Sequence, residues 1–513
     1  MNDVKIKKID ELFNEFDSAE KPGVVVGVTQ NGETQYVKAF GMANLEYGLA
    51  LSLDSVLQAG SVSKQFTAFA ILLLSEEGKI DLDDPVKKYL DYFPEFDHEI
   101  TVRHFVHHVS GLRSSVMYMM VNGVAMDDVF TNDLDITMTK KQQALNFEPD
   151  TFYTYCNLSY SLMAEIVASV TGKSFRAYVD ERIFKPLGMT NSFFHDTKFE
   201  LIKNKAEAYS VSPNGILNCP LVHSSYGSTN LFTTVKDMIL WANELMNPTV
   251  FPKATVEKAF TPHVCKNGYK SGYGFGFTVH DYQGKLAVEH GGAVAGYRAQ
   301  IYMIPEEKTA VLLLSNRGDF LSMRYAKKTL DIALDLPDIS STLQKIPANI
   351  DISGTYYVEK SKTTYPFIKS DEGTFLTVAE MKIEVLKKEE NRYVIPEFDV
   401  EFTLDENGKI QVYSNGNTLF GEKIHTAPIT ESDRKYAGKY IGIEFDSVHD
   451  VDFTEDTLRL TNNKTGEVPF KKYDNGIYID VAIGMVSVRF DGDTMYITSN
   501  RAVNVEFRKF TLT

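Results

Sequence analysis

The chain has 513 residues, 43% of them hydrophobic and 24% charged, which is enough for roughly two to four domains with substantial cores. The formal net charge is −16 and no basic block occurs, which argues against a nucleic-acid partner and against an anionic membrane surface. Three cysteines without a CxxC spacing favour neither a disulfide framework nor a zinc site.

The N-terminal segment predicts an amphipathic helix, because apolar residues recur at helical spacing between Val4 and Phe16. It contains no apolar core of a secretion signal. The longest apolar runs of the chain, AFAILLL and AVLLL, are far too short to cross a bilayer. We therefore expect a cytoplasmic protein without a membrane partner, or an exported one if a leader has been removed.

The next elements predict one antiparallel sheet covered by helices. Asn31 and Gly32 lie between VVVGVTQ and ETQYVKAFG, which is a strong hairpin signal. Residues 64–265 are mostly helical in pattern, strand-like runs follow between 275 and 315, and a last helix is expected near 319–335. The economical arrangement is an α/β (α+β) domain whose sheet is formed by both ends of this region.

The composition changes near Leu336 and Pro337, and short alternating strands follow from about residue 350. Two stretches begin alike, SGTY at 353 and AGKY at 437, and they lie 84 residues apart. Each opens about 75 residues of strands and turns, enough for about eight short strands, so we expect a tandem pair of small β-barrels or sandwiches. We predict three domains, at residues 1–337, 338–427 and 428–513.

A serine and a lysine stand at the start of an apolar helix, in the stretch GSVSKQFTAFAILLL. Positions i and i+3 share one face of a helix, so Ser61 and Lys64 can touch. Near the helix N-terminus, the Ser61 amide is free to bind an oxyanion. A lysine with a pKa lowered by burial can take the serine proton. The pair is therefore a candidate nucleophile and base.

Two further motifs offer partners for this pair. Tyr155 and Asn157 are separated by one residue, so they project to the same side of an extended loop, where a phenol can relay a proton and a carboxamide can hold a substrate. The second motif, HGG at 290–292, ends one predicted strand. Glycines there allow a substrate to lie along the strand edge, with the amide of Ala293 as the second oxyanion donor.

Each pattern alone is common. The SxxK spacing recurs at Ser18 and Ser432, and YxN recurs at Tyr413 and Tyr473, all in stretches typical of surfaces or turns. The HxxHH stretch at residues 104–108 lacks the glutamate of a zinc-protease motif, so we expect no metal site.

The ordered set SVSK, YCN and HGG resembles the serine β-lactamase and DD-peptidase superfamily, in particular its class C-like branch. HHVSGLR, KPLGM and STNLFTTVKDM agree with this resemblance, which covers about residues 1–335. It implies that Ser61 is the acylated nucleophile, Lys64 its base, Tyr155 a proton shuttle and Asn157 a substrate ligand.

His290 departs from the family pattern, because many members have a lysine there. A mostly neutral histidine holds a substrate carboxylate less firmly, so substrates without that carboxylate are expected. Its place in the motif makes His290 a fourth catalytic candidate, and Gly291, Gly292 and Ala293 line the same substrate edge.

The three-domain layout resembles the D-aminopeptidases of this branch, in which a loop of the last barrel reaches the active site, and residues 474–486 are our guess for it. Lipocalin-like accessory barrels are the alternative. We expect a serine hydrolase of small amides, peptides or esters without a cofactor. Its partner is then a small-molecule or short-peptide substrate, and a homodimer is left open. A β-lactamase or DD-peptidase, an esterase, an acyl-transferring thioesterase or cyclase, and a binding module are the alternatives.

Overall fold

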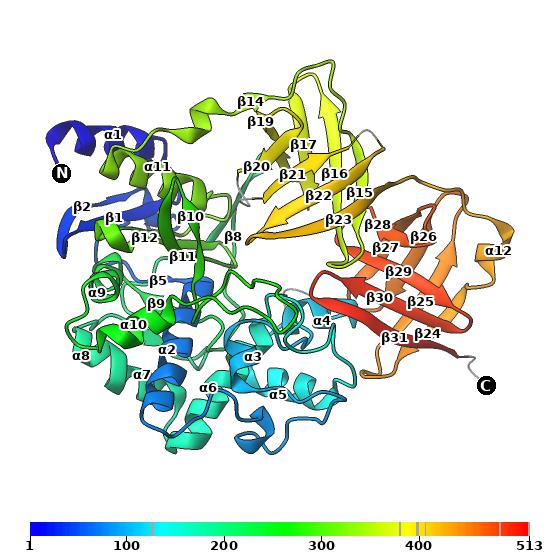
Figure 1. Ribbon diagram of the computed structural model, residues 1–513, viewed down its shortest axis with the longest axis horizontal. Coiled ribbons are helices and arrows are strands. Elements are labelled where there is room, and N and C mark those ends of the chain that lie inside the picture. The colour runs from blue at the N-terminus through cyan, green and yellow to red at the C-terminus, as the bar shows by residue number, and fades with distance from the viewer. Residues whose placement is uncertain (125–127, 379–380, 397–399, 406, 482–483, 511–513) are drawn as a thin grey trace.

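The computed structural model describes residues 1–124, 128–378, 381–396, 400–405, 407–481 and 484–510 (Figure 1). An N-terminal domain of helices around a sheet occupies one side of the molecule. Two β-domains follow it in the chain, and both lie against it. We call them the first β-domain (strands between residues 344 and 424) and the second β-domain (strands between residues 438 and 510).

The N-terminal domain is built on a six-stranded antiparallel sheet in the order β10-β11-β12-β13-β1-β2. Both ends of the region contribute strands, as predicted. Asn31 and Gly32 connect β1 and β2 with φ angles of 54° and 81°, the left-handed pair that a tight hairpin turn needs. The strands are β1 (Val24–Gln30), β2 (Glu33–Phe40), β10 (Thr278–Tyr282), β11 (Lys285–Val294), β12 (Tyr297–Ile304) and β13 (Thr309–Ser315).

Helices cover both faces of this sheet. Helices α1 (Asp3–Phe13) and α11 (Ser322–Leu334) share a core with one face, and α9 (Val235–Met246) packs on the other. Helix α2 (Ser63–Glu76) is buried along residues 63–74, so its first turn has a fixed place. The remaining helices of the domain are α3 (Val102–Val106), α4 (Ser115–Val121), α5 (Asn132–Lys141), α6 (Asn157–Thr171), α7 (Phe175–Val179), α8 (Lys185–Leu187) and α10 (Lys253–Ala259).

Short strands complete the N-terminal domain in three small sheets. They are β3 (Met42–Asn44), β4 (Leu49–Ala50), β5 (Leu57–Gln58), β6 (Phe193–Phe194), β7 (Tyr209–Ser212), β8 (Gly215–Asn218) and β9 (Leu231–Thr233).

The first β-domain is a ten-stranded sheet in the order β14-β19-β20-β21-β22-β23-β15-β16-β17-β18. Among the described residues its end strands β14 and β18 are not paired with each other. The strands are β14 (Gln344–Lys345), β15 (Gly354–Val358), β16 (Thr363–Ser370), β17 (Gly373–Val378), β18 (Met381–Glu384), β19 (Leu386–Glu389), β20 (Arg392–Ile395), β21 (Val400–Leu404), β22 (Lys409–Ser414) and β23 (Asn417–Ile424).

The second β-domain is a closed barrel of eight strands. A short helix, α12 (Glu431–Arg434), precedes it. The strands are β24 (Gly438–Gly442), β25 (Val448–Phe453), β26 (Leu458–Asn462), β27 (Gly466–Lys472), β28 (Tyr478–Asp480), β29 (Val486–Asp491), β30 (Thr494–Ser499) and β31 (Ala502–Phe510). The two β-domains have the predicted all-β character.

The barrel and the N-terminal domain share a hydrophobic core. Tyr118 and Met119 of α4 belong to the same buried cluster as Tyr440 and Phe507 of the barrel. Helix α4 packs directly on β30 and β31. The hairpin formed by these two strands is therefore held against the N-terminal domain.

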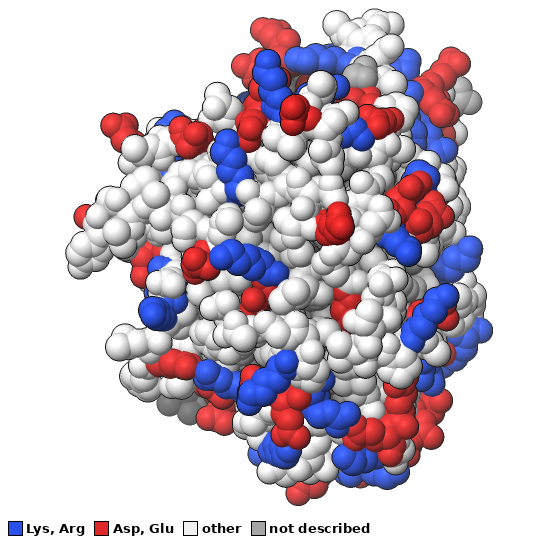
Figure 2. All heavy atoms as spheres, turned by 90° about the vertical axis from the view of Figure 1, so that its left-hand side faces the viewer, with Lys and Arg blue, Asp and Glu red and all other residues white. Residues whose placement is uncertain are grey.

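Acidic and basic side chains are interspersed over the face of the molecule on the left of Figure 1, which Figure 2 shows in front view. On this face they do not segregate into a basic patch of the kind that binds nucleic acid. Within the described residues, no helix combines the length and the apolar character that crossing a membrane requires.

Candidate active site

Ser61 and Lys64 lie where the chain enters helix α2. Ser61 is in a 3-10 turn, η2 (Gly60–Val62), that leads directly into the helix. The Nζ atom of Lys64 is 3.3 Å from Ser61 Oγ. Ser61 is partly exposed, whereas Lys64 is completely buried. The structure therefore brings the predicted pair together with its hydroxyl open to solvent.

The surroundings of Lys64 favour its neutral amine. Burial lowers its pKa well below the usual 10.5, and the charge of Arg501 lowers it further. Lys64 Nζ lies 2.8 Å from Asn157 Oδ1 and 2.8 Å from the carbonyl oxygen of Ser228. Both oxygens can only accept, so they take the two N–H bonds of a neutral amine. Its lone pair is then left for the Ser61 hydroxyl.

Tyr155 lies in the loop before α6, and Asn157 is the first residue of that helix. Lys64 Nζ is 4.7 Å from the centre of the Tyr155 ring. Burial raises the pKa of the Tyr155 phenol, and the neighbouring Ser61 hydroxyl opposes this rise. Among the described residues the buried Tyr155 hydroxyl has no hydrogen bond of normal geometry. It is therefore available to a bound substrate.

The backbones of η2 and β11 are in direct contact beside Ser61. A Cβ atom on Gly60, which has a φ of +54°, would lie 2.6 Å from Ala293 N, and one on Gly292 would lie 2.0 Å from the carbonyl oxygen of Ala59. Glycine is therefore needed at both positions. This contact brings the amide of Ala293 next to the turn that carries Ser61, as an oxyanion site requires.

Strand β11 offers an open edge at this point. The predicted strand end at residues 290–292 is wrong, because β11 continues to Val294. Its partner β10, however, pairs with it only as far as Glu289. The outer edge of residues 290–294 is thus not covered by β10, and an extended substrate can be added there.

His290, on strand β11 beside the site, is neutral. Burial lowers its pKa to about 3. Its Nδ1 lies 2.6 Å from the carbonyl oxygen of Gly291, which can only accept, so Nδ1 carries the proton. Its Nε2 then accepts a hydrogen bond from Tyr273 Oη at 2.8 Å. Both ring nitrogens are occupied, which leaves none for proton transfer with a substrate.

Three residues of the site were not predicted. Ser228 contributes only its carbonyl oxygen, and Tyr273 holds the ring of His290. Arg501 comes from the turn between β30 and β31 of the second β-domain, and its guanidinium carbon lies 4.9 Å from the centre of the Tyr155 ring. Ser228 is the first residue of the stretch STNLFTTVKDM but acts through its backbone, and no quoted motif contains Tyr273 or Arg501, which reach the site through tertiary packing.

The proposed barrel loop covers residues 474–486, whereas Arg501, a barrel residue that contacts Tyr155, lies outside this range. The described part of the loop contacts the first β-domain: Thr364 Oγ1 donates a hydrogen bond to the carbonyl oxygen of Gly484, and Ile477 packs in a cluster with Ile424. Residues 482 and 483 lie outside the described residues. The turn at Arg501 is a described segment of the second β-domain that contacts Tyr155.

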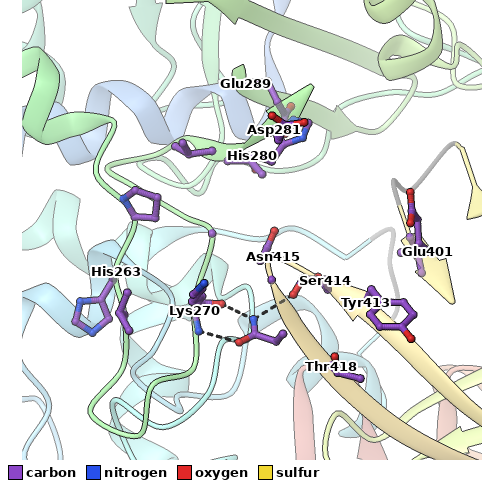
Figure 3. A pocket seen from close by; sticks show the side chains of 18 of the residues that line it. His263, Lys270, His280, Asp281, Glu289, Glu401, Tyr413, Ser414, Asn415 and Thr418 are labelled. Atoms are coloured by element: carbon purple, nitrogen blue, oxygen red, sulfur yellow. Dashed lines mark hydrogen bonds between the residues drawn. The ribbon is translucent and has the colours of Figure 1, made fainter. Parts of the chain in front are cut away.

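A large cavity lies elsewhere, between the N-terminal domain and the first β-domain (Figure 3). It measures about 900 Å³, and its walls come from residues 262–289, Met323 and strands β20–β23. The hydrogen bonds between Lys270 and Asn417 link its two sides. Ser61, Lys64 and Tyr155 do not line it.

One group of described residues could hold a metal ion. It comprises Asp150, His263 and Cys265, whose ligand atoms lie within 4.8 Å of one another. His263 Nε2 donates a hydrogen bond to Asp150 Oδ1 at 2.6 Å, so the group is also consistent with a hydrogen-bonded cluster. The histidines of the HxxHH stretch do not belong to it.

The sheet between helices, with a serine and a lysine at the start of a buried helix and an open strand edge beside them, defines a β-lactamase/transpeptidase-like fold. The family model described as Beta-lactamase matches residues 9–334. The chain therefore belongs to the beta-lactamase family.

Similar proteins include hydrolases and penicillin-binding proteins. A D-aminopeptidase of Brucella anthropi is 29% identical over 336 residues, which are 64% of this chain and 62% of that protein, so the chain aligns with less than two thirds of the relative's length. Penicillin-binding protein 4* of Bacillus subtilis (strain 168) is 25% identical over 435 residues, 79% of this chain and 96% of that protein.

A solved structure covers nearly the whole chain. The octameric penicillin-binding protein homologue from Pyrococcus abyssi matches 99% of this chain and 100% of its own, with a TM-score of 0.58 and 21% identity. At this identity the likeness shows the shared fold.

Proposed function

We propose that the protein is a serine hydrolase that cleaves small amides, peptides or esters through an acyl-enzyme on Ser61. The observation that carries the proposal is the convergence on one buried amine: Ser61 Oγ and Asn157 Oδ1 lie 3.3 Å and 2.8 Å from Lys64 Nζ. A deprotonated lysine between a hydroxyl and two acceptors is the arrangement that activates a serine.

Acylation would begin when the neutral Lys64 amine takes the Ser61 proton. The Ser61 oxygen then attacks the substrate carbonyl carbon. The amides of Ser61 and Ala293 stabilise the negative charge on the carbonyl oxygen, and the NH₂ group of Asn157, whose oxygen is held by Lys64, donates to the substrate. As the bond to the leaving group breaks, the Tyr155 hydroxyl passes a proton to it and takes a proton back from the Lys64 ammonium, which becomes a neutral amine again.

Deacylation reverses these proton transfers. A water molecule takes the place of the leaving group, and as its oxygen attacks the acyl carbon it gives one proton to Tyr155, which passes its own proton to the neutral Lys64 amine. Lys64 then returns this proton to Ser61 as the ester bond breaks and the acid product departs. We assign His290 a positioning role here, since both of its nitrogens are bonded to Tyr273 and Gly291.

D-aminoacyl amides and peptides are our leading substrates, because a D-aminopeptidase is among the similar proteins. A β-lactamase or DD-peptidase activity is the second candidate, favoured by the likeness to penicillin-binding protein 4*. The cytoplasmic location and the homodimer stay predictions, and the octamer is a property of the Pyrococcus protein.

A substrate panel tests the proposal. Paired D- and L-alanine p-nitroanilides, p-nitrophenyl esters and nitrocefin are incubated with the wild type, Ser61→Ala and Ser432→Ala. Ser432 carries the same SxxK spacing in the second β-domain region and is the matched control. We expect Ser61→Ala to lower kcat at least ~10³-fold and Ser432→Ala to leave it unchanged. Equal turnover by Ser61→Ala and the wild type would remove the proposal.

A further inference from the structure

We propose that Arg501, supplied by the second β-domain, forms an anion-binding subsite of the active site and selects substrates that carry a carboxylate close to the cleaved bond. This inference rests on the proposed function and names its substrate class. It reverses the expectation drawn from His290 alone, because the positive charge that His290 lacks is supplied by a different domain.

The guanidinium group lies within reach of the reacting atoms. Arg501 Cζ and Lys64 Nζ are 4.9 Å and 4.7 Å from the centre of the same Tyr155 ring. Lys64 in turn contacts Ser61 Oγ. Arg501 and Lys64 thus contact the same ring, and the charge of Arg501 acts on Lys64, so a substrate bound at Ser61 can extend a carboxylate toward Arg501.

The hydrogen-bonding groups of Arg501 are unused. Its guanidinium takes part in no hydrogen bond or ion pair with any other residue that the structure describes. It lies instead over the face of the Tyr155 ring, in a cation–π contact. An arginine normally finds a carboxylate, since its fork of N–H groups matches two carboxylate oxygens. The nearby carboxylate of Glu289, whose charge raises the pKa of Tyr155, is bonded elsewhere: its Oε2 accepts a hydrogen bond from Gln300 Nε2 at 2.6 Å.

The backbone of Arg501 is fixed, which separates it from an ordinary surface arginine. Its carbonyl oxygen accepts hydrogen bonds from Ser114 N at 2.9 Å and Asn146 Nδ2 at 3.2 Å. Asn146 Oδ1 also accepts from Val503 N at 2.7 Å, so both sides of the turn are held. The chain therefore places this cation beside Tyr155 before any substrate arrives.

A cavity next to the turn is also lined by positively charged side chains. This cavity of about 190 Å³ is lined by Thr154 and Asn500, the neighbours of Tyr155 and Arg501, together with Lys360 and Lys362 of the first β-domain, of which Lys362 is paired with Glu359. Its lining contains no carboxylate. The Arg501 guanidinium and the Lys360 ammonium therefore give this side of the site a positive charge that favours an anionic group on the ligand.

Boronic acids test the subsite, because they add reversibly to an active-site serine and need no knowledge of the natural substrate. Phenylboronic acid is compared with 3- and 4-carboxyphenylboronic acid as a competitor of Ser61 labelling by a fluorophosphonate. The variants are Arg501→Gln, Arg501→Lys and the control Arg508→Gln, whose side chain is exposed and paired with Glu506.

In the wild type we expect at least one carboxylate-bearing boronate to bind about tenfold or more tightly than phenylboronic acid. Arg501→Gln should reduce this ratio to about one while binding phenylboronic acid within about threefold of the wild type. Arg501→Lys should keep part of the ratio, because the charge remains but the fork is lost. Arg508→Gln should keep all of it.

Equal binding of all three boronates by the wild type, or an unchanged ratio in Arg501→Gln, would overturn the subsite while leaving the proposed hydrolase intact. Absence of Ser61 labelling in the wild type without any boronate would overturn both. The ratio of two affinities in one variant does not depend on the amount of folded protein, so a partial loss of folding in Arg501→Gln leaves the test decisive.

Discussion

A buried ion pair attaches the second β-domain to the N-terminal domain, and breaking it should weaken that attachment. Arg113 and Glu444 are each 2% exposed and lie 2.5 Å apart. Glu444 also accepts hydrogen bonds from the Tyr118 hydroxyl and from Gln143 N. Glu444→Gln keeps the volume but leaves the Arg113 cation buried without a counter-charge. We expect it to lower the free energy of unfolding by about 3–5 kcal/mol.

Two probes separate the domains in urea titrations. The single tryptophan of the chain, Trp241, is buried in the N-terminal domain, so its fluorescence reports unfolding there, whereas far-UV circular dichroism includes the β-domains. The dichroism transition of Glu444→Gln should move to lower urea more than the fluorescence transition. The control Glu257→Gln removes an exposed pair with Lys253 and should change stability by less than about 1 kcal/mol.

A double variant decides whether the charge is the cause. Replacing both partners, Arg113→Met with Glu444→Met, leaves no buried cation without a counter-charge. The double variant should therefore lower the free energy of unfolding by less than Glu444→Gln alone. A single variant within about 0.5 kcal/mol of the wild type, or a double variant less stable than the single one, would contradict the reasoning.

Three further predictions concern the site. Because the pKa of Lys64 is lowered, the rate of Ser61 acylation should rise as the pH increases through that lowered pKa. Between the lowered pKa and the usual one, the unfolded chain binds one proton more than the folded chain, so the free energy of unfolding should also rise with pH in this range. Both pH dependences should vanish in Lys64→Met. Gly60→Ala should abolish fluorophosphonate labelling and cost about 1–2 kcal/mol, since its φ is +54° and its Cβ would meet Ala293 N. Tyr155→Phe should lower kcat by about 10²–10⁴-fold with an unchanged dichroism spectrum; normal turnover would refute the proton relay.

Local features made the central pair predictable. Ser61 and Lys64 are three residues apart on one helix, so the spacing alone brings them together once the helix is recognised. The hairpin at Asn31 and Gly32 is equally local, because two left-handed residues determine the turn. The glycines at 291 and 292 indicated a close backbone approach, and the structure shows it at Gly292, which contacts Ala59 and Gly60.

Features that depend on packing between distant segments were beyond the sequence. The strand order of the first β-domain places β14 beside β19, and short alternating strands do not specify such a partner. In the sequence, Arg501 does not differ from other charged turn residues, because its position beside Tyr155 depends on the packing of the barrel on α4. The role of His290 also changed, because only the structure shows that Tyr273 and Gly291 occupy both of its nitrogens.

The existence of an acyl-enzyme on Ser61 is measured most directly by mass spectrometry of protein quenched during turnover of a p-nitrophenyl ester. We expect one acyl group per chain, located by peptide mapping on the fragment that contains Ser61 and missing from Ser61→Ala. Steady turnover with no acyl group bound, or an acyl group on any other residue that persists in Ser61→Ala, would contradict it.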